Sequence, residues 1–167
     1  MDRLTQPSIA IELLADRPDL IAELARLRWH EWSRHPGRED PQWWIDTTRR
    51  ETGRALPPVT FVAIDETGNA SGGIGLVPVE HPELADRGPW VVGAVVRPDR
   101  RGRGVGGTLL TGLKLWATRT GIERLWVSTG GHPADFYIHC GFRTTDLVDL
   151  PGRDRLTILT VQLGTTD

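Results

Sequence analysis

The first third of the chain places one short apolar run ahead of two segments whose apolar positions recur every three or four residues. Residues 8–14 are typical of a short strand, and helical spacing begins near Pro18. Asp40 followed by Pro41 is typical of an N-cap and a first helical turn, which predicts a second helix that ends near Gly53. The chain is therefore expected to open with a strand and two helices.

Three apolar runs in the middle of the chain predict the centre of a sheet. Residues 60–64 and 73–79 flank the turn-forming segment 65–69, which indicates a hairpin. Residues 90–96 are apolar almost without interruption, as expected for a strand that is covered on both faces. We expect this strand at the centre of the sheet.

The last third of the chain predicts more helices and strands. From Gly104 to Gly121, apolar residues recur three and four apart along one helix. A strand, a short helix and two further strands are predicted at 124–128, 133–139, 142–147 and 156–163. The fold class is therefore mixed α/β, with an α+β type of sheet, and the length of 167 residues fits one domain over residues 1–167.

Composition and charge exclude several classes of protein. The net charge of -2 gives no global field that would gather nucleic acid or a membrane surface. The one cysteine, Cys140, leaves no disulfide framework and no cysteine-rich zinc site, and we expect no metal. No segment approaches the roughly 20 apolar residues that span a bilayer. We expect a cytoplasmic protein without nucleic-acid or membrane partners, and the sequence leaves open whether it forms a homodimer.

The segment from Val96 to Thr108 joins a buried strand to a helix through a glycine-rich turn. Glycines remove side chains from the turn, so that successive backbone N–H groups can converge on an anion at the helix N-terminus. Guanidinium groups suit phosphate oxygens, and four arginines fall in this segment: Arg97, Arg100, Arg101 and Arg103. We therefore expect a binding site for a diphosphate.

Two nucleotide-binding motifs compete as explanations of this turn. Gly102, Gly104 and Gly107 satisfy G-x-G-x-x-G, and Glu123 lies near the distance expected of a ribose-binding acid. However, Glu123 precedes its strand, and the strands before the turn form a hairpin instead of a βαβ unit. A Walker A loop would need a lysine before Thr108. A nicotinamide-dependent oxidoreductase therefore remains only an alternative.

Two motifs resemble those of the GNAT superfamily of acetyltransferases. Residues 101–106, RGRGVG, are similar to its R/Q-x-x-G-x-G/A acetyl-CoA signature, with the V-x-P-x-x-R-G lead-in from Val96. Residues 136–142, FYIHCGF, resemble the F-Y-x-x-x-G-F segment of the family. The resemblance covers about residues 59–147. It implies a GNAT-like fold, in which helices flank a central, mostly antiparallel, V-splayed sheet.

The resemblance also implies an activity and roles for named residues. The activity is transfer of the acetyl group of acetyl-CoA directly to a primary amine of a small molecule or peptide. Backbone groups of Ala94, Val95 and Val96 would pair with the pantetheine arm and the acetyl carbonyl. The diphosphate would be held by Arg101, Gly102, Arg103, Gly104, Val105, Gly106, Gly107 and Thr108. Tyr137, a phenol that is protonated at neutral pH, would be the general acid for the departing thiolate.

The resemblance leaves some of the chemistry open. An asparagine that the family often carries seven places before the tyrosine is Gly130 here, so cofactor contacts at that place are expected to differ. The general base could be Glu80, His81 or Glu83, or a chain of waters, and Glu80 is the first candidate. Cys140 is expected to be a small apolar residue instead of an acyl-carrying nucleophile.

The sequence does not identify the acceptor. Four tryptophans crowd the two N-terminal helices, where they pack a core or grip an apolar or cationic acceptor: Trp29, Trp32, Trp43 and Trp44. Nearby acidic residues favour a cationic amine: Glu31, Glu39 and Asp40. A catalytically silent sensor of acyl-CoA with the same fold is the alternative function.

Overall fold

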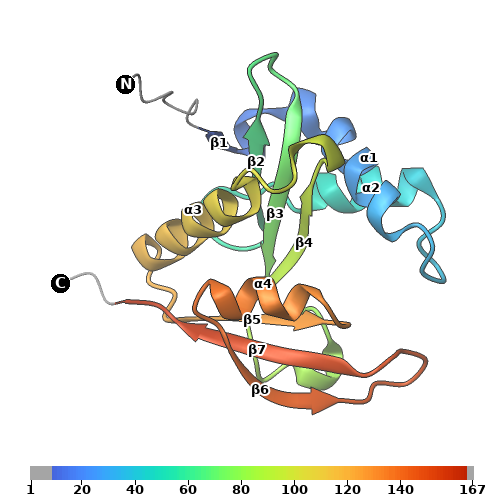
Figure 1. Cartoon of the computed structure of the whole chain (residues 1–167), viewed down its shortest axis with the longest axis vertical. Coiled ribbons are helices and arrows are strands. Elements are labelled where there is room, and N and C mark those ends of the chain that lie inside the picture. Colours follow the sequence, from blue (N-terminus) through green and yellow to red (C-terminus); the bar gives the residue numbers. More distant parts are fainter. Residues whose placement is uncertain (1–8, 165–167) are drawn as a thin grey trace.

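A computed structural model describes residues 9–164 and shows a seven-stranded sheet with helices on both faces (Figure 1). The strand order is β1-β2-β3-β4-β5-β7-β6, and only the β4–β5 pair is parallel. The strands are β1 (Ala10–Leu13), β2 (Val59–Ile64), β3 (Ala70–Val77), β4 (Trp90–Val96), β5 (Arg124–Thr129), β6 (Arg143–Val148) and β7 (Leu156–Gln162). The α-helices are α1 (Ile21–Trp32), α2 (Pro41–Arg50), α3 (Val105–Arg119) and α4 (Pro133–His139).

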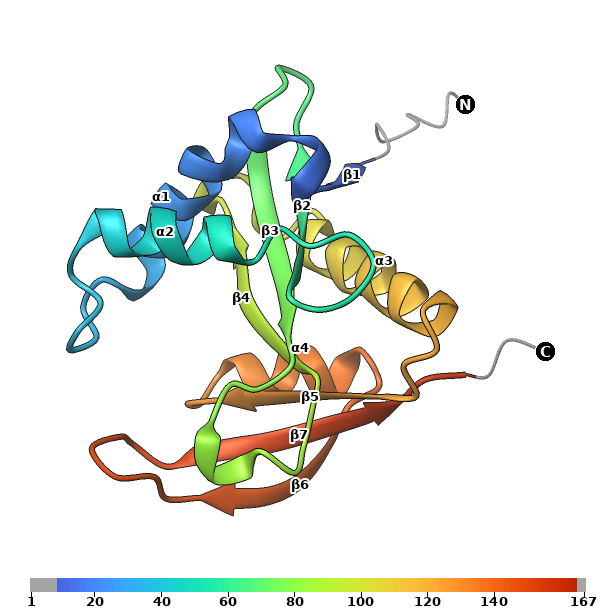
Figure 2. The ribbon, with the colours of Figure 1, turned by 180° about the vertical axis from the view of Figure 1, so that it is seen from behind.

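The sheet opens between β4 and β5. These two strands are in register only at Trp90 and Trp126, near the start of each strand. Beyond this pair the strands diverge, so that β2–β4 and β5–β7 run in different directions in Figures 1 and 2. The middle of β4, residues 92–94, is only half-buried because no strand pairs with that edge. The V-splayed, mostly antiparallel sheet and the central position of β4 are thereby confirmed.

Helices α1 and α3 cover opposite faces of the β1–β4 half. Neighbouring residues of a strand face opposite sides of its sheet. A Cβ atom on Gly72 would contact Val105 and Leu109 of α3, whereas one on Gly73 would collide with Leu24 of α1. Glycines in β3 therefore allow both helices to pack closely on the sheet.

Helix α4 lies on the same face of the sheet as α3. The larger hydrophobic core joins Leu113 of α3 to Leu125 and Val127 of β5, and to Tyr137 and Phe142 at α4. A separate, smaller core lies under α1 on the other face. The opening between β4 and β5 can therefore be approached from two sides, one bounded by α3 and α4 and the other by α1 and α2.

The predicted helices and strands are present, with shifted ends. Helix α1 begins at Ile21, later than the predicted start near Pro18, because Pro18–Leu20 form a 3₁₀ turn, and it ends at Trp32. The carboxylate of Asp40 accepts a hydrogen bond of 2.9 Å from the Gln42 N–H, which confirms the predicted N-cap of α2. Strand β3 ends at Val77 instead of residue 79, since proline follows and offers no N–H to the ladder.

The first strand is shorter than predicted. Residue 8 of the predicted segment lies outside the described residues, and β1 ends at Leu13 because Leu14–Asp16 form a 3₁₀ turn.

Within residues 9–164, no helix has both the length and the hydropathy that crossing a bilayer requires.

Three of the four tryptophans, Trp29, Trp32 and Trp44, make contacts that join the N-terminal helices. Trp32 stacks on Trp44 with ring centroids 5.7 Å apart. The indole N–H groups of Trp29 and Trp44 donate to the backbone oxygens of Glu39 and Arg38, at 2.8 and 2.9 Å. These contacts hold α1 against α2 through the loop that joins them.

Candidate active site

The turn between β4 and α3 presents a row of unpaired backbone donors. Gly102 and Gly104 have φ of +74° and +83°, a left-handed conformation that favours glycine. Among the described residues, no N–H from Gly102 to Gly107 has a hydrogen-bond acceptor, and the first bond of α3 runs from the Thr108 N–H to the Gly104 oxygen at 3.0 Å. Unpaired donors at a helix N-terminus attract anions.

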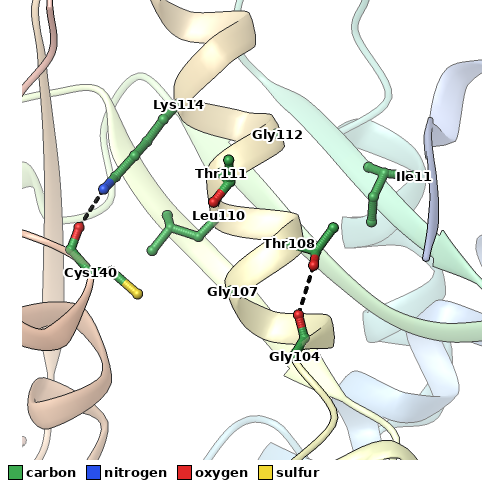
Figure 3. Close-up of a pocket in the computed structure, with 9 residues that line it drawn as sticks. All are labelled: Ile11, Gly104, Gly107, Thr108, Leu110, Thr111, Gly112, Lys114 and Cys140. Carbon is green, nitrogen blue, oxygen red and sulfur yellow. Dashed lines mark hydrogen bonds between the residues drawn. The ribbon is translucent and has the colours of Figure 1, made fainter. Parts of the chain in front are cut away.

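A groove of about 570 Å³ runs along α3 beside these donors (Figure 3). The Thr108 hydroxyl turns back to the Gly104 carbonyl at 2.8 Å, and the Lys114 ammonium donates to the Cys140 carbonyl at the end of α4. A Cβ atom on Gly107 would have no neighbour within 4 Å, so the groove is open above the turn. Its lining residues are Ile11, Gly104, Gly107, Thr108, Leu110, Thr111, Gly112, Lys114 and Cys140.

Two of the four arginines stiffen the turn instead of facing an anion. Arg97 donates to Asp65 at 2.8 Å and to Asp99 at 2.6 Å. Arg100 makes a two-pronged contact with Glu66, at 2.9 and 2.6 Å. Both arginines thereby tie the turn to the β2–β3 hairpin, and carboxylates neutralise the positive charge that the sequence suggested for the anion.

The other two arginines differ from each other. Arg101 donates to the Val96 carbonyl and to Glu31 of α1, each at 3.0 Å. Arg103 is exposed and has no ion pair within residues 9–164. Of the four, Arg103 is therefore the one whose charge is available to a ligand in this structure.

Strand β4 carries a bulge at the opening of the sheet. The β3–β4 register shifts between Gly73 and Gly75, so that Gly93 and Ala94 together lie opposite Ile74. Gly93 has a φ of +60°, which a residue with a side chain rarely adopts. Ala94, Val95 and Val96, which are predicted to contact the pantetheine arm, begin at this bulge. They lie on the edge of β4 that does not pair with β5.

Tyr137 is buried in α4 beside the opening. Its ring packs edge-on against Phe136 and Phe142, with centroids 5.1 and 5.3 Å away, and 5% of the residue is exposed. Burial, followed by the charge of Glu80, raises the pKa of the phenol above its ordinary value. Tyr137 therefore stays protonated throughout the neutral range.

Glu80 belongs to a hydrogen-bonded group with Ser128 and His81. The Ser128 hydroxyl donates to the Glu80 carboxylate at 3.1 Å, and Nε2 of His81 lies 2.8 Å from the same hydroxyl oxygen. Since the single hydroxyl hydrogen goes to Glu80, the His81 ring nitrogen is assigned as donor to Ser128. His81 is 2% exposed, and burial lowers its pKa, which favours this neutral ring.

The Glu80 carboxyl has the properties of a base that works near neutral pH. Burial raises its pKa to about 7, against the opposing effect of the hydrogen bond from Ser128. The side chain keeps 29% exposure, so that a substrate can reach it. Val127 faces the core under α4, hence its neighbour Ser128 and the Glu80 carboxylate face the other side of the sheet.

The structure separates the three candidate bases. It brings Glu80 and His81 together at Ser128, whereas Glu83 lies exposed on a 3₁₀ turn. Glu80 and Tyr137 lie on opposite faces of the sheet, and the charge of Glu80 adds to the effect of burial in raising the pKa of the phenol. Sequence reasoning missed Ser128, because a lone serine in a strand belongs to no motif.

The acidic residues near Glu80 are not those that the sequence suggested. Glu51, at the end of α2, is half-buried, and its burial raises its pKa. Glu51 and Arg153, which lies in the β6–β7 connection, act electrostatically on Glu80 in opposite directions. Glu31 instead pairs with an arginine of the turn, and Asp40 caps α2.

The remaining sequence candidates lie at the edges of the site. Cys140 is partly buried and packs against the core shared by α3 and α4, as expected of a small apolar residue. Gly130 and His132 are exposed in the connection between β5 and α4.

A splayed mixed sheet with a glycine-rich turn after its central strand is typical of GNAT-type acetyltransferases. Residues 20–142 match the profile of a family described as the acetyltransferase (GNAT) family. The chain belongs to this family, which confirms the resemblance found in the sequence motifs.

Solved structures share the fold along nearly the whole chain. An aminoglycoside 6'-N-acetyltransferase complexed with coenzyme A has a TM-score of 0.76 and 16% identity, over 95% of this chain and 99% of that one. A putative acetyltransferase from Salmonella typhimurium with acetyl-CoA has a TM-score of 0.72 and 20% identity, over 96% of both chains. A putative phosphinothricin N-acetyltransferase has a TM-score of 0.66 and 25% identity, over 94% of this chain and 99% of that one. No curated protein matches the sequence.

Proposed function

We propose that this protein transfers the acetyl group of acetyl-CoA directly to a primary amine of a small molecule or peptide. Membership of the family supports acetyl transfer. The observation that carries the proposal is the row of unpaired backbone N–H groups from Gly102 to Gly107. This row directly follows β4, the strand at which the sheet splays. Coenzyme A bears a diphosphate that suits these donors, and two structures of the same fold contain coenzyme A or acetyl-CoA.

In the proposed complex, the turn fixes one end of the cosubstrate and the bulge of β4 receives the other. Amides of the turn, together with Arg103, hold the diphosphate. The backbone of Ala94, Val95 and Val96 pairs with the pantetheine arm, because this edge of β4 has no neighbouring strand. The thioester then reaches the opening between Tyr137 on one face and Glu80 on the other.

The reaction needs a deprotonated amine and a protonated leaving group. The amine nitrogen attacks the thioester carbonyl carbon, the C–N bond forms and the C–S bond breaks. Glu80 accepts the proton that the nitrogen loses, and Tyr137 donates its proton to the departing sulfur, which leaves as the thiol of coenzyme A. Exchange with solvent then returns a proton to Tyr137 and removes one from Glu80, so the overall reaction consumes no net proton.

The acceptor side favours an amine that arrives as a cation. Glu80 places a carboxyl group that ionises near neutral pH on the face bounded by α1 and α2, whereas Glu51 is paired with Arg28. An alkylammonium is attracted to the ionised Glu80 and loses its first proton through this carboxylate to solvent before it attacks, so that Glu80 can accept the second proton and the overall reaction releases one proton. This argument covers polyamines, aminoglycosides, amino acids and peptide N-termini alike.

The variant Gly107→Glu tests the diphosphate site. Gly107 has no neighbour within 4 Å and no positive φ, so a side chain fits without backbone strain, unlike at Gly104. A carboxylate placed there would repel the diphosphate, and we expect the Kd for coenzyme A to rise by roughly 10- to 100-fold in calorimetry.

Gly107→Ala is the matched control for that variant. Alanine is the better helix former by about 1 kcal/mol, so the control should fold at least as well as the wild type. It should bind coenzyme A more tightly than Gly107→Glu does. Equal affinity of the Glu variant and the wild type would place the diphosphate elsewhere.

The activity itself is tested with a panel of amines. Thiol release from acetyl-CoA should appear with at least one polyamine, aminoglycoside, amino acid or peptide. Tight binding of coenzyme A without thiol release for any amine would favour the silent sensor. Greater thermal stabilisation by NAD than by coenzyme A would favour the oxidoreductase alternative.

A further inference from the structure

Arg28 of α1 is a buried charge that contacts the bulge of β4. It is 1% exposed, and its Nε donates to the Gly93 carbonyl at 3.2 Å. Its Nη1 donates to Thr48 at 3.1 Å and lies 3.8 Å from the carboxylate of Glu51. Both helices of the acceptor side are thereby connected, through one side chain, to the strand at the opening of the sheet.

The bulge is shaped to receive the guanidinium group. A Cβ atom on Gly93 would lie 2.7 Å from Cζ, Nε and Nη2 of Arg28, which is closer than atoms approach. A Cβ atom on Gly75 of β3 would lie 3.4 Å from Nη2. The guanidinium therefore occupies space that two glycines leave, and the positive φ of Gly93 independently requires glycine at that position.

This contact fixes the direction of one peptide unit. In a planar trans peptide, the carbonyl of one residue and the N–H of the next point in opposite directions. Arg28 holds the Gly93 carbonyl toward the face of α1 and α2. The N–H of Ala94 is consequently directed toward the other face, where the turn of α3 and Tyr137 lie, and β5 does not pair with β4 at this level.

We propose that Arg28 is a positioning residue for acetyl transfer: by holding the Gly93 carbonyl, it aims the Ala94 N–H at the thioester oxygen of bound acetyl-CoA. This inference rests on the proposed function. Negative charge develops on that oxygen during attack by the amine, and a donor fixed in advance stabilises it without reorganisation. The positive charge at the other end of the same peptide strengthens the N–H as a donor. Arg28 itself does not contact the substrate.

Isotope-edited infrared spectroscopy of bound acetyl-CoA, labelled at the thioester carbonyl, tests the direction of the donor. In the wild type, the carbonyl stretch should lie at lower frequency than in free acetyl-CoA. Arg28→Met has no donor for Gly93 and should lose most of this shift, with kcat about 100-fold lower. The affinity for acetyl-CoA should persist, because the turn that holds the diphosphate is untouched.

Arg28→Gln and Thr48→Val are the matched controls. The amide nitrogen of glutamine falls where Nε of arginine lies, so Arg28→Gln should retain most of the shift although it lacks the charge. Thr48→Val removes a different contact of Arg28 and should also retain it. Equal loss of the shift in Arg28→Met and Arg28→Gln, or retention of the full shift in Arg28→Met, would overturn the proposal.

A measurement on the wild type keeps the inference testable even if Arg28→Met does not fold. The amide proton resonance of Ala94 should move to lower field on binding acetyl-CoA, and less on binding coenzyme A, which has no acetyl oxygen. Identical Ala94 resonances in both complexes would overturn the positioning role but leave the proposed function intact. A wild type that binds neither ligand would overturn both.

Discussion

Tyr137→Phe should lower kcat by about 100- to 10,000-fold and leave the Kd for acetyl-CoA unchanged. The substitution removes only the hydroxyl, which is the proton donor for the departing thiolate. The ring keeps its packing against Phe136 and Phe142, so the fold and the diphosphate site are preserved. Single-turnover kinetics with acetyl-CoA and an accepted amine, alongside calorimetry of acetyl-CoA binding, measure both quantities.

The raised pKa of Tyr137 adds a second readout. Because burial and the charge of Glu80 keep the phenol protonated, the wild type should show no loss of activity from tyrosine ionisation up to about pH 10, the ordinary pKa of this side chain. The melting temperature of Tyr137→Phe serves as the control for folding. Wild-type turnover in the folded variant would remove Tyr137 from the chemistry.

Glu80→Gln should remove the part of the pH profile that belongs to the base. The Glu80 pKa of about 7 means that the carboxylate form increases as pH rises through neutrality, so wild-type kcat/KM should rise over the same interval. The variant cannot accept a proton, and we expect a loss of about 100-fold or more together with disappearance of this limb. A limb due to deprotonation of the free amine would remain.

Glu83→Gln is the matched control for Glu80→Gln. Glu83 lies three residues away but is exposed on the 3₁₀ turn, whereas the hydrogen bonds of the Ser128 hydroxyl in the described structure go to Glu80 and His81. Its profile should coincide with that of the wild type. If Glu80→Gln kept the neutral limb as well, the proton would pass through another group or a chain of waters.

Thermal stability should report the same ionisation. The folded-state pKa of Glu80 is raised above its unfolded value of about 4.5, so the folded state favours the protonated carboxyl. Below the unfolded pKa, Glu80 is protonated in both states and has no effect on the free energy of unfolding. As pH rises from there toward about 7, the unfolded state ionises more readily than the folded state, so the folded state loses stability. Glu80→Gln should therefore gain melting temperature relative to the wild type over this interval.

Local patterns in the sequence were sufficient to predict the elements that carry the cosubstrate site. The continuous apolar run gave β4, with the same bounds that the structure has. Glycines 102 and 104 predicted the turn because their positive φ is a local requirement of the backbone. The family motifs then placed Tyr137, which stays a proposal as general acid.

Contacts between distant elements could not be predicted in this way. Arg97 and Arg100 were expected to attract an anion, but their partners lie in the β2–β3 hairpin, more than 30 residues earlier. Arg28 meets Gly93 across 65 positions, and Ser128 meets Glu80 across 48. Such pairs depend on sheet register and helix packing, which apolar periodicity does not specify.

The most direct test of the account is a crystal structure of the protein with coenzyme A. We expect oxygens of the diphosphate within about 3.2 Å of backbone nitrogens between Gly102 and Gly107. The pantetheine arm should run along Ala94 to Val96 toward Tyr137. A diphosphate bound away from the turn, with these amides still unpaired, would contradict the account.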